Sequence, residues 1–475
     1  MKCLSSLFTI FIVSVSGFSV TAQNARGIAN RQSFDLVILG GTIVTMDPQR
    51  RMIENGGIAI RNGEIVRVGK AGEMRGLRAA RTINAAGKVV IPGLINTHTH
   101  VPMSLFRGIS DDLDLNDWLT KYIFPAEAKN VDEAFVRAGT RLGLAEMIRG
   151  GTTTYCDMYY FEDAIADETK KAGVRGVLGE TIIDFPVADN KTHEQAIAYA
   201  ERFVNKWKND PLIIPALAPH APYTVSTEHL RAIRRLSDKL NAPIVTHVAE
   251  TKKERDDIKS DPKTGNGDTP VKYLDRIGFL NNRVIAAHTV WLSDEEIDIL
   301  KHYGVGSAHN PQSNMKLASG VAPIPKMLAK DVAVGLGTDG AASNNDLDMW
   351  EEMDTAAKLH KVFSGDPKTL PAETAFEMAT IRGARALHLE KLIGSIEVGK
   401  RADIIVVDID SLHQTPVYNL FSHLVYATKA SDVRTVVING TIIMMDRRLL
   451  TLNEATIKSD ANRYRKKIIN SLSAK

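Results

Sequence analysis

The middle of the chain alternates short apolar segments with amphipathic ones, and this alternation restricts the fold more than any other feature. Eight segments have the character of buried strands: 89–97, 151–157, 174–182, 212–219, 243–248, 284–289, 304–308 and 332–338. Helical patterns separate them, for example over 131–148 and 227–240. Eight successive strand–helix units predict a parallel (β/α)8 barrel of the TIM type. The carboxyl ends of the strands form the active face of such barrels, so polar chemistry should gather there.

Both flanks of this region have the short apolar runs and turn residues of β-structure. The N-terminal flank includes Asn62-Gly63 between two such runs, which is a strong hairpin signal, and the C-terminal flank repeats the pattern over 403–407 and 433–441. We expect the two ends to form one small β-sandwich with the barrel inserted between them. The predicted parts are 23–88 and 394–450 for the sandwich, 89–393 for the barrel and 451–475 for a C-terminal helical tail.

Residues 1–22 are typical of a secretory signal peptide. Lys2 is followed by an apolar stretch over 7–15 and by small residues up to Ala22. We expect cleavage after Ala22 and a periplasmic or secreted protein, with an uncleaved membrane anchor as the alternative. Cys3 would leave with the signal, so Cys156 would be alone and no internal disulfide could form.

The overall composition is that of an ordinary globular protein. Hydrophobic residues make up 44% and charged residues 24% of the 475 positions, and the net charge is +3. This balance gives no electrostatic reason to expect a nucleic acid as a partner. The expected partner is a small-molecule substrate, without membrane association after signal cleavage, and a homo-oligomer stays open.

Histidines concentrate where the barrel model places its active face. His98 and His100 end the first strand, and residues two apart on a strand point to the same side. A single buried histidine is usually structural, but six of the 13 histidines stand at predicted strand ends, which favours a metal site. These six are His98, His100, His220, His247, His288 and His309.

Four motifs together resemble the amidohydrolase superfamily, and within it the methylthioadenosine/S-adenosylhomocysteine deaminases and the triazine chlorohydrolases. The similarity extends from about residue 34 to about residue 440, and 394–403 is similar to the family's return into its sandwich. The motifs are 92–100 (PGLINTHTH), His247 with Glu250, Ala287-His288, and 337–344 (GTDGAASN).

The resemblance implies one zinc ion per chain, held by His98, His100, His247 and Asp339. Three imidazoles and one carboxylate, with room for water, are typical of an open catalytic zinc site. Relatives with two metals carry a bridging lysine or carboxylate at the end of the fourth strand, where this chain has His220, so one metal is favoured. Iron could replace zinc, because nitrogen and oxygen ligands select weakly among first-row metals.

The residue types then suggest a hydrolytic mechanism. Water activated by the metal attacks the substrate, Asp339 takes its proton, and His288 orients it. Glu250 protonates the ring nitrogen beside the attacked carbon, and ammonia leaves. Each residue also has a plainer interpretation: a surface ion pair for Glu250, a structural role for His288 and a helix cap for Asp339. Glu254, in the charged run after Glu250, is expected to be a solvated charge.

Further residues are candidates for binding the substrate. Glu127 resembles the family glutamate that holds ribose hydroxyls, with a helix-start carboxylate as the alternative, and His220 matches the family's substrate histidine. His309 and Asn310 match a family run on the seventh strand, where a structural role explains them at least as well. Trp118 could line the apolar part of the pocket, but core packing explains it better. The third strand ends in Gly179-Glu180-Thr181, where nucleoside-deaminating relatives offer an arginine toward the substrate tail. This difference weakens the expectation of a homocysteine tail.

Three functions are compatible with the sequence. The first is a zinc-dependent deaminase of an adenosine-like or other amino-heterocyclic substrate. The second is a cyclic amide hydrolase or a triazine-type chlorohydrolase of the same superfamily. The third is an exported barrel that binds a ligand without catalysis. Ammonia release from a panel of amino-heterocycles separates them.

Overall fold

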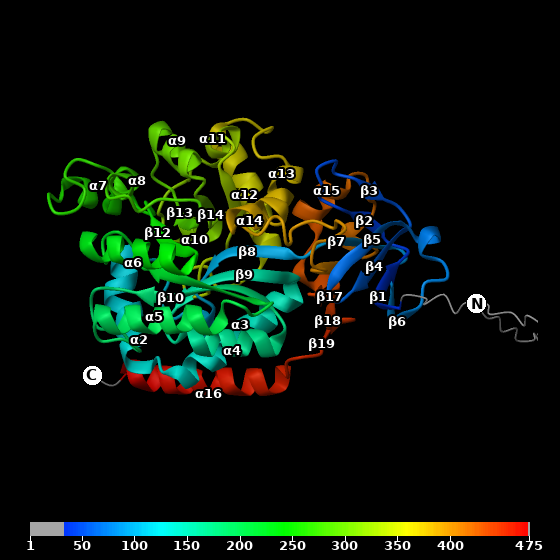
Figure 1. Ribbon diagram of the computed structural model, residues 1–475, viewed down its shortest axis with the longest axis horizontal. Helices are drawn as coiled ribbons and strands as arrows, with labels where there is room; N and C mark the ends of the chain where they lie inside the picture. The colour runs from blue at the N-terminus through cyan, green and yellow to red at the C-terminus, as the bar shows by residue number, and fades with distance from the viewer. Residues whose placement is uncertain (1–32, 474–475) are drawn as a thin grey trace, which may run out of the picture.

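The computed structural model describes residues 33–473. Its central domain is a barrel of eight parallel strands in chain order. Figure 1 shows this domain with helices around the strands. Each strand pairs in parallel with the next, and the Asp339 N–H donates to the His98 carbonyl at 2.9 Å where the last strand meets the first. The expected (β/α)8 barrel is confirmed. Its strands are β8 (Leu94–Thr99), β9 (Thr152–Tyr159), β10 (Arg175–Ile182), β11 (Ile213–Pro219), β12 (Ile244–Val248), β13 (Val284–His288), β14 (Gly306–His309) and β15 (Ala333–Leu336).

Helices cover the outside of the barrel. Several begin where the sequence offers a capping side chain: Asp132, Thr192, Ser226 and Ser293 each accept a hydrogen bond from a backbone N–H of the first turn. The helices after the first strand are α1 (Leu115–Asp117), α2 (Phe124–Asn130), α3 (Glu133–Gly150), α4 (Glu162–Ala172), α5 (His193–Trp207), α6 (Thr227–Leu240), α7 (Lys252–Ser260), α8 (Pro270–Arg276), α9 (Asp294–Tyr303), α10 (Pro311–Lys316), α11 (Ile324–Ala329), α12 (Met349–Ser364), α13 (Ala372–Met378) and α14 (Ile381–Ala386).

Both ends of the chain form the β-sandwich beside the barrel (Figure 1). One sheet has the order β5-β4-β1-β6 and the other the order β19-β18-β17-β16-β7-β2-β3. Buried side chains of both sheets, among them Ile38, Ile58, Val90 and Ile404, form one apolar core. The strands are β1 (Phe34–Leu39), β2 (Thr42–Val44), β3 (Met52–Ile53), β4 (Gly56–Arg61), β5 (Glu64–Lys70), β6 (Ala79–Asn84), β7 (Lys88–Pro92), β16 (Ile404–Asp408), β17 (Val433–Ile438), β18 (Thr441–Met445) and β19 (Arg448–Leu449).

The stretch predicted as one strand, 89–97, is two strands that belong to different sheets. Strand β7 pairs antiparallel with β16 in the sandwich, whereas β8 pairs with β9 in the barrel. The chain passes between them at Gly93, where a Cβ atom would lie 2.1 Å from the Thr153 hydroxyl oxygen. The apolar run continues unbroken across this glycine because both strands are buried, which explains the single predicted strand.

The last helix, α16 (Glu454–Ser473), lies along the barrel wall beside α3 (Figure 1). The ring of Tyr464 meets Phe135 edge-on at 5.6 Å. Within residues 33–473, no helix combines the length and apolar character needed to span a membrane. Cys156 is buried and unpaired. The predicted signal peptide and Cys3 lie outside the described residues.

Candidate active site and metal centre

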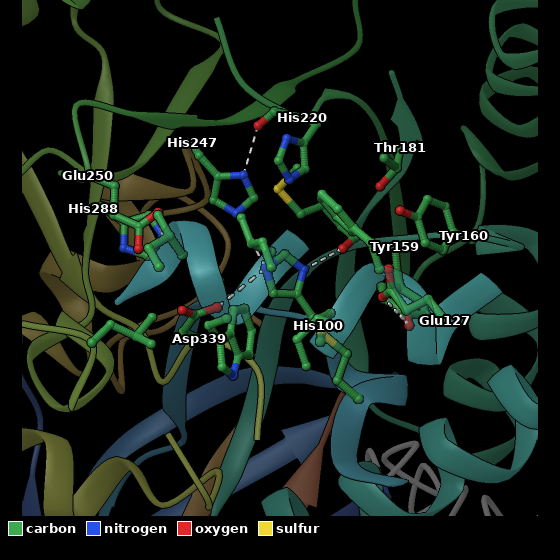
Figure 2. A pocket seen from close by; sticks show the side chains of 18 of the residues that line it. His100, Glu127, Tyr159, Tyr160, Thr181, His220, His247, Glu250, His288 and Asp339 are labelled. Carbon is green, nitrogen blue, oxygen red and sulfur yellow. Dashed lines mark hydrogen bonds and ion pairs between the residues drawn. The ribbon is translucent and has the colours of Figure 1, made fainter. Parts of the chain in front are cut away.

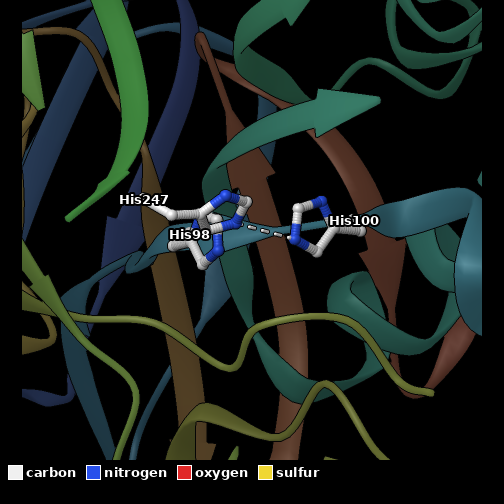
Figure 3. A group of neighbouring side chains, drawn as sticks. All are labelled: His98, His100 and His247. Carbon is white, nitrogen blue, oxygen red and sulfur yellow. Dashed lines mark hydrogen bonds between the residues drawn. The ribbon is translucent and has the colours of Figure 1, made fainter. Parts of the chain in front are cut away.

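The side chains of His98, His100 and His247 converge at the carboxyl end of the barrel (Figure 3). His98 belongs to β8, His100 follows it directly, and His247 comes from β12 on the opposite side of the barrel. Nε2 of His100 lies 3.3 Å from Nε2 of His247. One donor atom from each of the three imidazoles lies within 4.8 Å of the others, and His98, His288 and Asp339 form a second, overlapping group of the same kind.

Backbone carbonyls fix the orientation of two of these imidazoles. Nδ1 of His100 bonds to the carbonyl of Met158 at 2.7 Å, and Nδ1 of His247 bonds to the carbonyl of His220 at 2.8 Å. Because a carbonyl can only accept, each Nδ1 carries the proton and each Nε2 presents a lone pair to the centre. This tautomer is the one a metal ligand requires.

Asp339 completes the centre from the loop after β15. Its Oδ1 lies 3.3 Å from Nε2 of His100 and 3.5 Å from Nε2 of His98. Its Oδ2 accepts hydrogen bonds from the hydroxyls of Ser313 at 2.7 Å and Ser343 at 3.0 Å. Burial alone would raise the pKa of Asp339, but the facing imidazoles of His100 and His98 hold it well below its usual value.

The donor set fits a divalent metal. Both ring nitrogens of His98 are buried without a hydrogen-bond partner, which is rare for a buried polar group. A cation placed among His98, His100, His247 and Asp339 would satisfy Nε2 of His98, which faces Asp339, and would balance the carboxylate. Imidazole and carboxylate ligands of this kind suit zinc and its first-row neighbours.

Glu250 and His288 stand beside this centre, facing each other (Figure 2). Nε2 of His288 lies 3.7 Å from Oε2 of Glu250, and Nδ1 of His288 lies 3.0 Å from the amide oxygen of Asn314. Ser319 also approaches Oε1 of Glu250 at 3.5 Å. Burial raises the pKa of Glu250 above its ordinary value, which favours a carboxyl group that can donate a proton.

Glu254 is not the solvated charge that the sequence suggested. Its carboxylate is buried and accepts hydrogen bonds from the backbone N–H groups of Ala249 at 2.9 Å and Glu250 at 2.7 Å. Burial raises its pKa to about 7. The charged run Lys252-Lys253-Glu254 therefore folds inward at its third residue, because the chain turning out of β12 leaves two N–H groups that need acceptors.

The backbone takes a left-handed conformation at three strand ends of the site. The φ angles are +54° at Ala249, +73° at His288 and +62° at Asp339. Non-glycine residues rarely adopt this conformation, and such strain is typical of functional sites. Of the three, His288 and Asp339 line the pocket, and Ala249 immediately precedes the pocket residue Glu250.

Glu127 and His220 line the same pocket (Figure 2). Oε1 of Glu127 accepts a hydrogen bond from the Tyr159 hydroxyl at 2.7 Å, and burial raises the pKa of Glu127 to about 7. His220 follows β11, bonds through Nδ1 to the Thr224 hydroxyl at 3.0 Å, and has its pKa lowered to about 3 by burial. These hydrogen bonds use Oε1 of Glu127 and Nδ1 of His220, so Oε2 of Glu127 and Nε2 of His220 can contact a ligand in the pocket.

Of the remaining candidates, one lies in the pocket and two lie outside it. Trp118 lines the pocket, as does the pair Tyr159-Tyr160, which the sequence analysis missed although it ends a barrel strand. His309 bonds to His360 at 3.1 Å, and Asn310 approaches His288 at 3.3 Å; both are buried and absent from the pocket lining. Their positions support structural roles.

This fold and this site define a hydrolase with a metal centre at the mouth of a barrel. The family model for the amidohydrolase family matches residues 89–443, and the chain belongs to that family. Its function is that of a hydrolytic deaminase, acting on carbon–nitrogen bonds.

Three relatives illustrate the similarity. A 5-methylthioadenosine/S-adenosylhomocysteine deaminase from Syntrophobacter fumaroxidans is 49% identical over 88% of this chain and 95% of its own length. A 5′-deoxyadenosine deaminase from Methanosarcina barkeri is 43% identical over 93% of this chain and 100% of its own length. The crystal structure of an adenosine deaminase from Xanthomonas campestris with bound zinc superposes with a TM-score of 0.90 at 40% identity, covering 92% of this chain and 99% of the other.

Proposed function

We propose that this protein is a zinc-dependent deaminase of adenosine-like nucleosides. The observation that carries the proposal is the pair Glu250 and His288, which face each other in the same pocket as the imidazole cluster and Glu127. The zinc-bound relative and the nucleoside deaminases named above support both the metal and the substrate class.

The metal would be held by His98, His100, His247 and Asp339. Bound there, zinc supplies Lewis acidity that makes water a nucleophile near neutral pH. The side chains around the metal position would bind the substrate and transfer protons. The buried carboxylate of Asp339 accepts the proton of the attacking water, and the two serine hydroxyls on its Oδ2 keep the group in place.

His288 and Glu250 act on the other side of the reaction. Asn314 fixes the ring of His288 so that Nε2 points to the attacking water and to Glu250. Glu250, whose carboxyl pKa is raised by burial, donates a proton to the ring nitrogen next to the carbon that carries the amino group. The proton held by Asp339 then passes to the amino group, and the carbon–nitrogen bond breaks as ammonia leaves. The proton donated by Glu250 stays on the ring nitrogen, and the proton of the newly bonded hydroxyl returns to Glu250 as the carbon–oxygen double bond forms.

Glu127 is the residue we assign to the ribose. A carboxylate can accept hydrogen bonds from two neighbouring hydroxyls, and Tyr159 holds one of its oxygens in position. Among the described residues that line this pocket there is no lysine or arginine. A nucleoside with an uncharged 5′ substituent therefore fits better than one with a carboxylate at that end.

An ammonia-release assay on zinc-loaded protein tests the function. We expect turnover of 5′-deoxyadenosine and 5′-methylthioadenosine, slower turnover of S-adenosylhomocysteine, and none of a chlorotriazine or a cyclic amide. Chloride release from the triazine, or ring opening of the cyclic amide, without ammonia release would replace this function with the hydrolase alternative. Zinc binding without turnover of any panel member would favour the non-catalytic one.

We also propose that the protein is exported and acts in a periplasmic or secreted setting. The basis is the sequence pattern of residues 1–22. Mass spectrometry of the protein recovered outside the cytoplasm should find Gln23 as the first residue. Recovery of a chain that still begins with Met1 would contradict cleavage.

A further inference from the structure

A second group of potential metal ligands lies on the rim of the barrel, apart from the centre described above. It consists of Asp184, His193 and His229, and one donor atom from each lies within 4.8 Å of the others. Asp184 follows β10, His193 opens α5, and His229 lies in the first turn of α6. Helices α5 and α6 lie side by side on the barrel surface (Figure 1). Three separate elements thus bring the group together.

The two imidazoles present the same edge to one carboxylate oxygen. Nδ1 of His229 lies 2.8 Å and Nδ1 of His193 3.4 Å from Oδ1 of Asp184. The rings are parallel within 6°, with centroids 3.4 Å apart. Ligand atoms about 2.0–2.2 Å from one metal, at tetrahedral to octahedral angles, stand roughly 3.0–3.5 Å from each other. The 3.4 Å between His193 and Asp184 falls in that interval, whereas the 2.8 Å between His229 and Asp184 is a hydrogen-bond distance. Because the lone pairs of stacked rings run parallel, one ion bound at both imidazoles requires the rings to tilt apart.

Hydrogen bonds account for only one of the two imidazole Nδ1 atoms in this group. His229 pairs with Asp184, and Oδ2 of Asp184 accepts from the Ser226 N–H at 2.8 Å. Nδ1 of His193, however, is buried and has no hydrogen-bond partner. Burying a donor or acceptor without a hydrogen bond costs free energy of folding, and a bound ligand at this nitrogen would remove that cost.

We propose that Asp184, His193 and His229 form a second metal site that binds a zinc-like divalent cation. Two imidazoles and one carboxylate favour such a cation over magnesium, which prefers oxygen ligands. The side chains are 24%, 11% and 30% exposed, respectively, so water can complete the coordination shell. With three protein ligands and an open side, this site binds more weakly than the buried centre.

The site would join two loops that border the substrate pocket. Phe185, next to Asp184, packs against Phe124 of the pocket lining at 5.8 Å between ring centroids. The Asp184 N–H donates to the carbonyl of Thr224, whose hydroxyl contacts His220. A metal at the rim therefore cross-links the β10–α5 loop to the start of α6 and holds the pocket border in place.

Zinc binding to the full-length protein at micromolar free zinc tests this site, with metal analysis and thermal unfolding as readouts. We expect two zinc ions per chain and a midpoint that rises as the second binds, with no such response to magnesium. His229→Ala and the milder Asp184→Asn should each weaken the second site by more than the 10–100-fold typical of losing an outer-shell partner. His302→Ala, which removes an exposed histidine elsewhere, should keep both ions.

The outcome does not depend on the proposed enzymatic function, because no readout is an activity. His247→Ala should lose the buried zinc and keep the rim zinc, which assigns the two ions separately. A wild-type protein that binds no zinc beyond the ion removed by His247→Ala would overturn the proposal. A second zinc that persists in both His229→Ala and Asp184→Asn would also overturn it, since the ion would then lie elsewhere.

Discussion

Glu250 is the side chain on which the proposed chemistry most depends. Its carboxyl group is buried, faces His288 and has a raised pKa, so it is equipped to donate a proton. We expect Glu250→Gln to retain zinc and fold while kcat falls at least about 100-fold, since general acid–base groups contribute roughly 10²–10⁴-fold. Steady-state kinetics with metal analysis measure both properties.

The control for that variant follows from the structure. Glu254→Gln, the obvious choice from sequence, is unsuitable because Glu254 is buried under Glu250. Asp256→Asn is suitable, since Asp256 is exposed on α7 and pairs with Lys252 in a surface ion pair of little energetic weight. We expect it to behave as wild type. Near-normal deamination by zinc-loaded Glu250→Gln would show that the proton donor is another group.

Glu127 offers a prediction about pH and stability. Burial raises its pKa in the folded protein to about 7 from an ordinary value of 4.5. The folded state therefore holds this proton more tightly than the unfolded state, and stability from this group is present below pH 4.5 and lost as pH rises through 7. Glu127→Gln keeps an acceptor for Tyr159 and removes the titration.

The difference in thermal midpoint, variant minus wild type, should accordingly grow between about pH 4.5 and pH 7 and then level off. Thermal unfolding at half-unit pH steps measures it. A difference that stays constant across this range would mean that Glu127 titrates normally. The same variant should show a raised KM for nucleosides, as expected for a residue that holds the ribose.

Short connections at the strand ends carry as much of the site as the strands themselves. The turn from β12 into α7 carries Glu250, and the carboxylate of Glu254 accepts hydrogen bonds from two N–H groups of that turn, those of Ala249 and Glu250. Glu254→Gln exchanges one acceptor oxygen for an amide nitrogen that cannot accept. One buried N–H then loses its partner, at a cost of about 1–3 kcal/mol.

We expect Glu254→Gln to lower kcat by roughly tenfold with little change in zinc content or in KM, because the turn that carries Glu250 loosens. Glu254→Asp should recover less than wild-type activity but more than Glu254→Ala, since it keeps two acceptor oxygens on a shorter stem. Equal activity of wild type and Glu254→Ala would show that the turn needs no such support.

Strand ends explain what the sequence could and could not predict. The rule that barrel chemistry follows the strands predicts His98, His100, His247 and His288, the resemblance adds Asp339, and the structure places all five together. The same rule also selects His309, which lies outside the pocket. The sequence did not predict the division into two strands at Gly93, because apolar residues continue on both sides of this glycine. The sequence also did not predict the residues with left-handed backbone conformation, since an alanine such as Ala249 gives no indication of a positive φ.

The chain as a whole should contain one tightly held metal ion. Four converging ligands, with Nε2 of His98 lacking a hydrogen bond among them, account for one ion in the buried centre. After dialysis against metal-free buffer we expect about one zinc per chain, and His247→Ala should abolish it because the open site loses one of four ligands. Two ions that both disappear in His247→Ala would instead indicate a binuclear centre.

The pairing of β7 with β16 also has a consequence for how the chain folds. Lys88 pairs with Asp408, about 320 positions later, so this sheet cannot close until the C-terminal strands have been synthesised. Contacts so distant in sequence are slow to form. A chain of this topology therefore stays incompletely folded for longer. Truncation before β16 would leave the apolar strand β7 as an open edge, prone to aggregation.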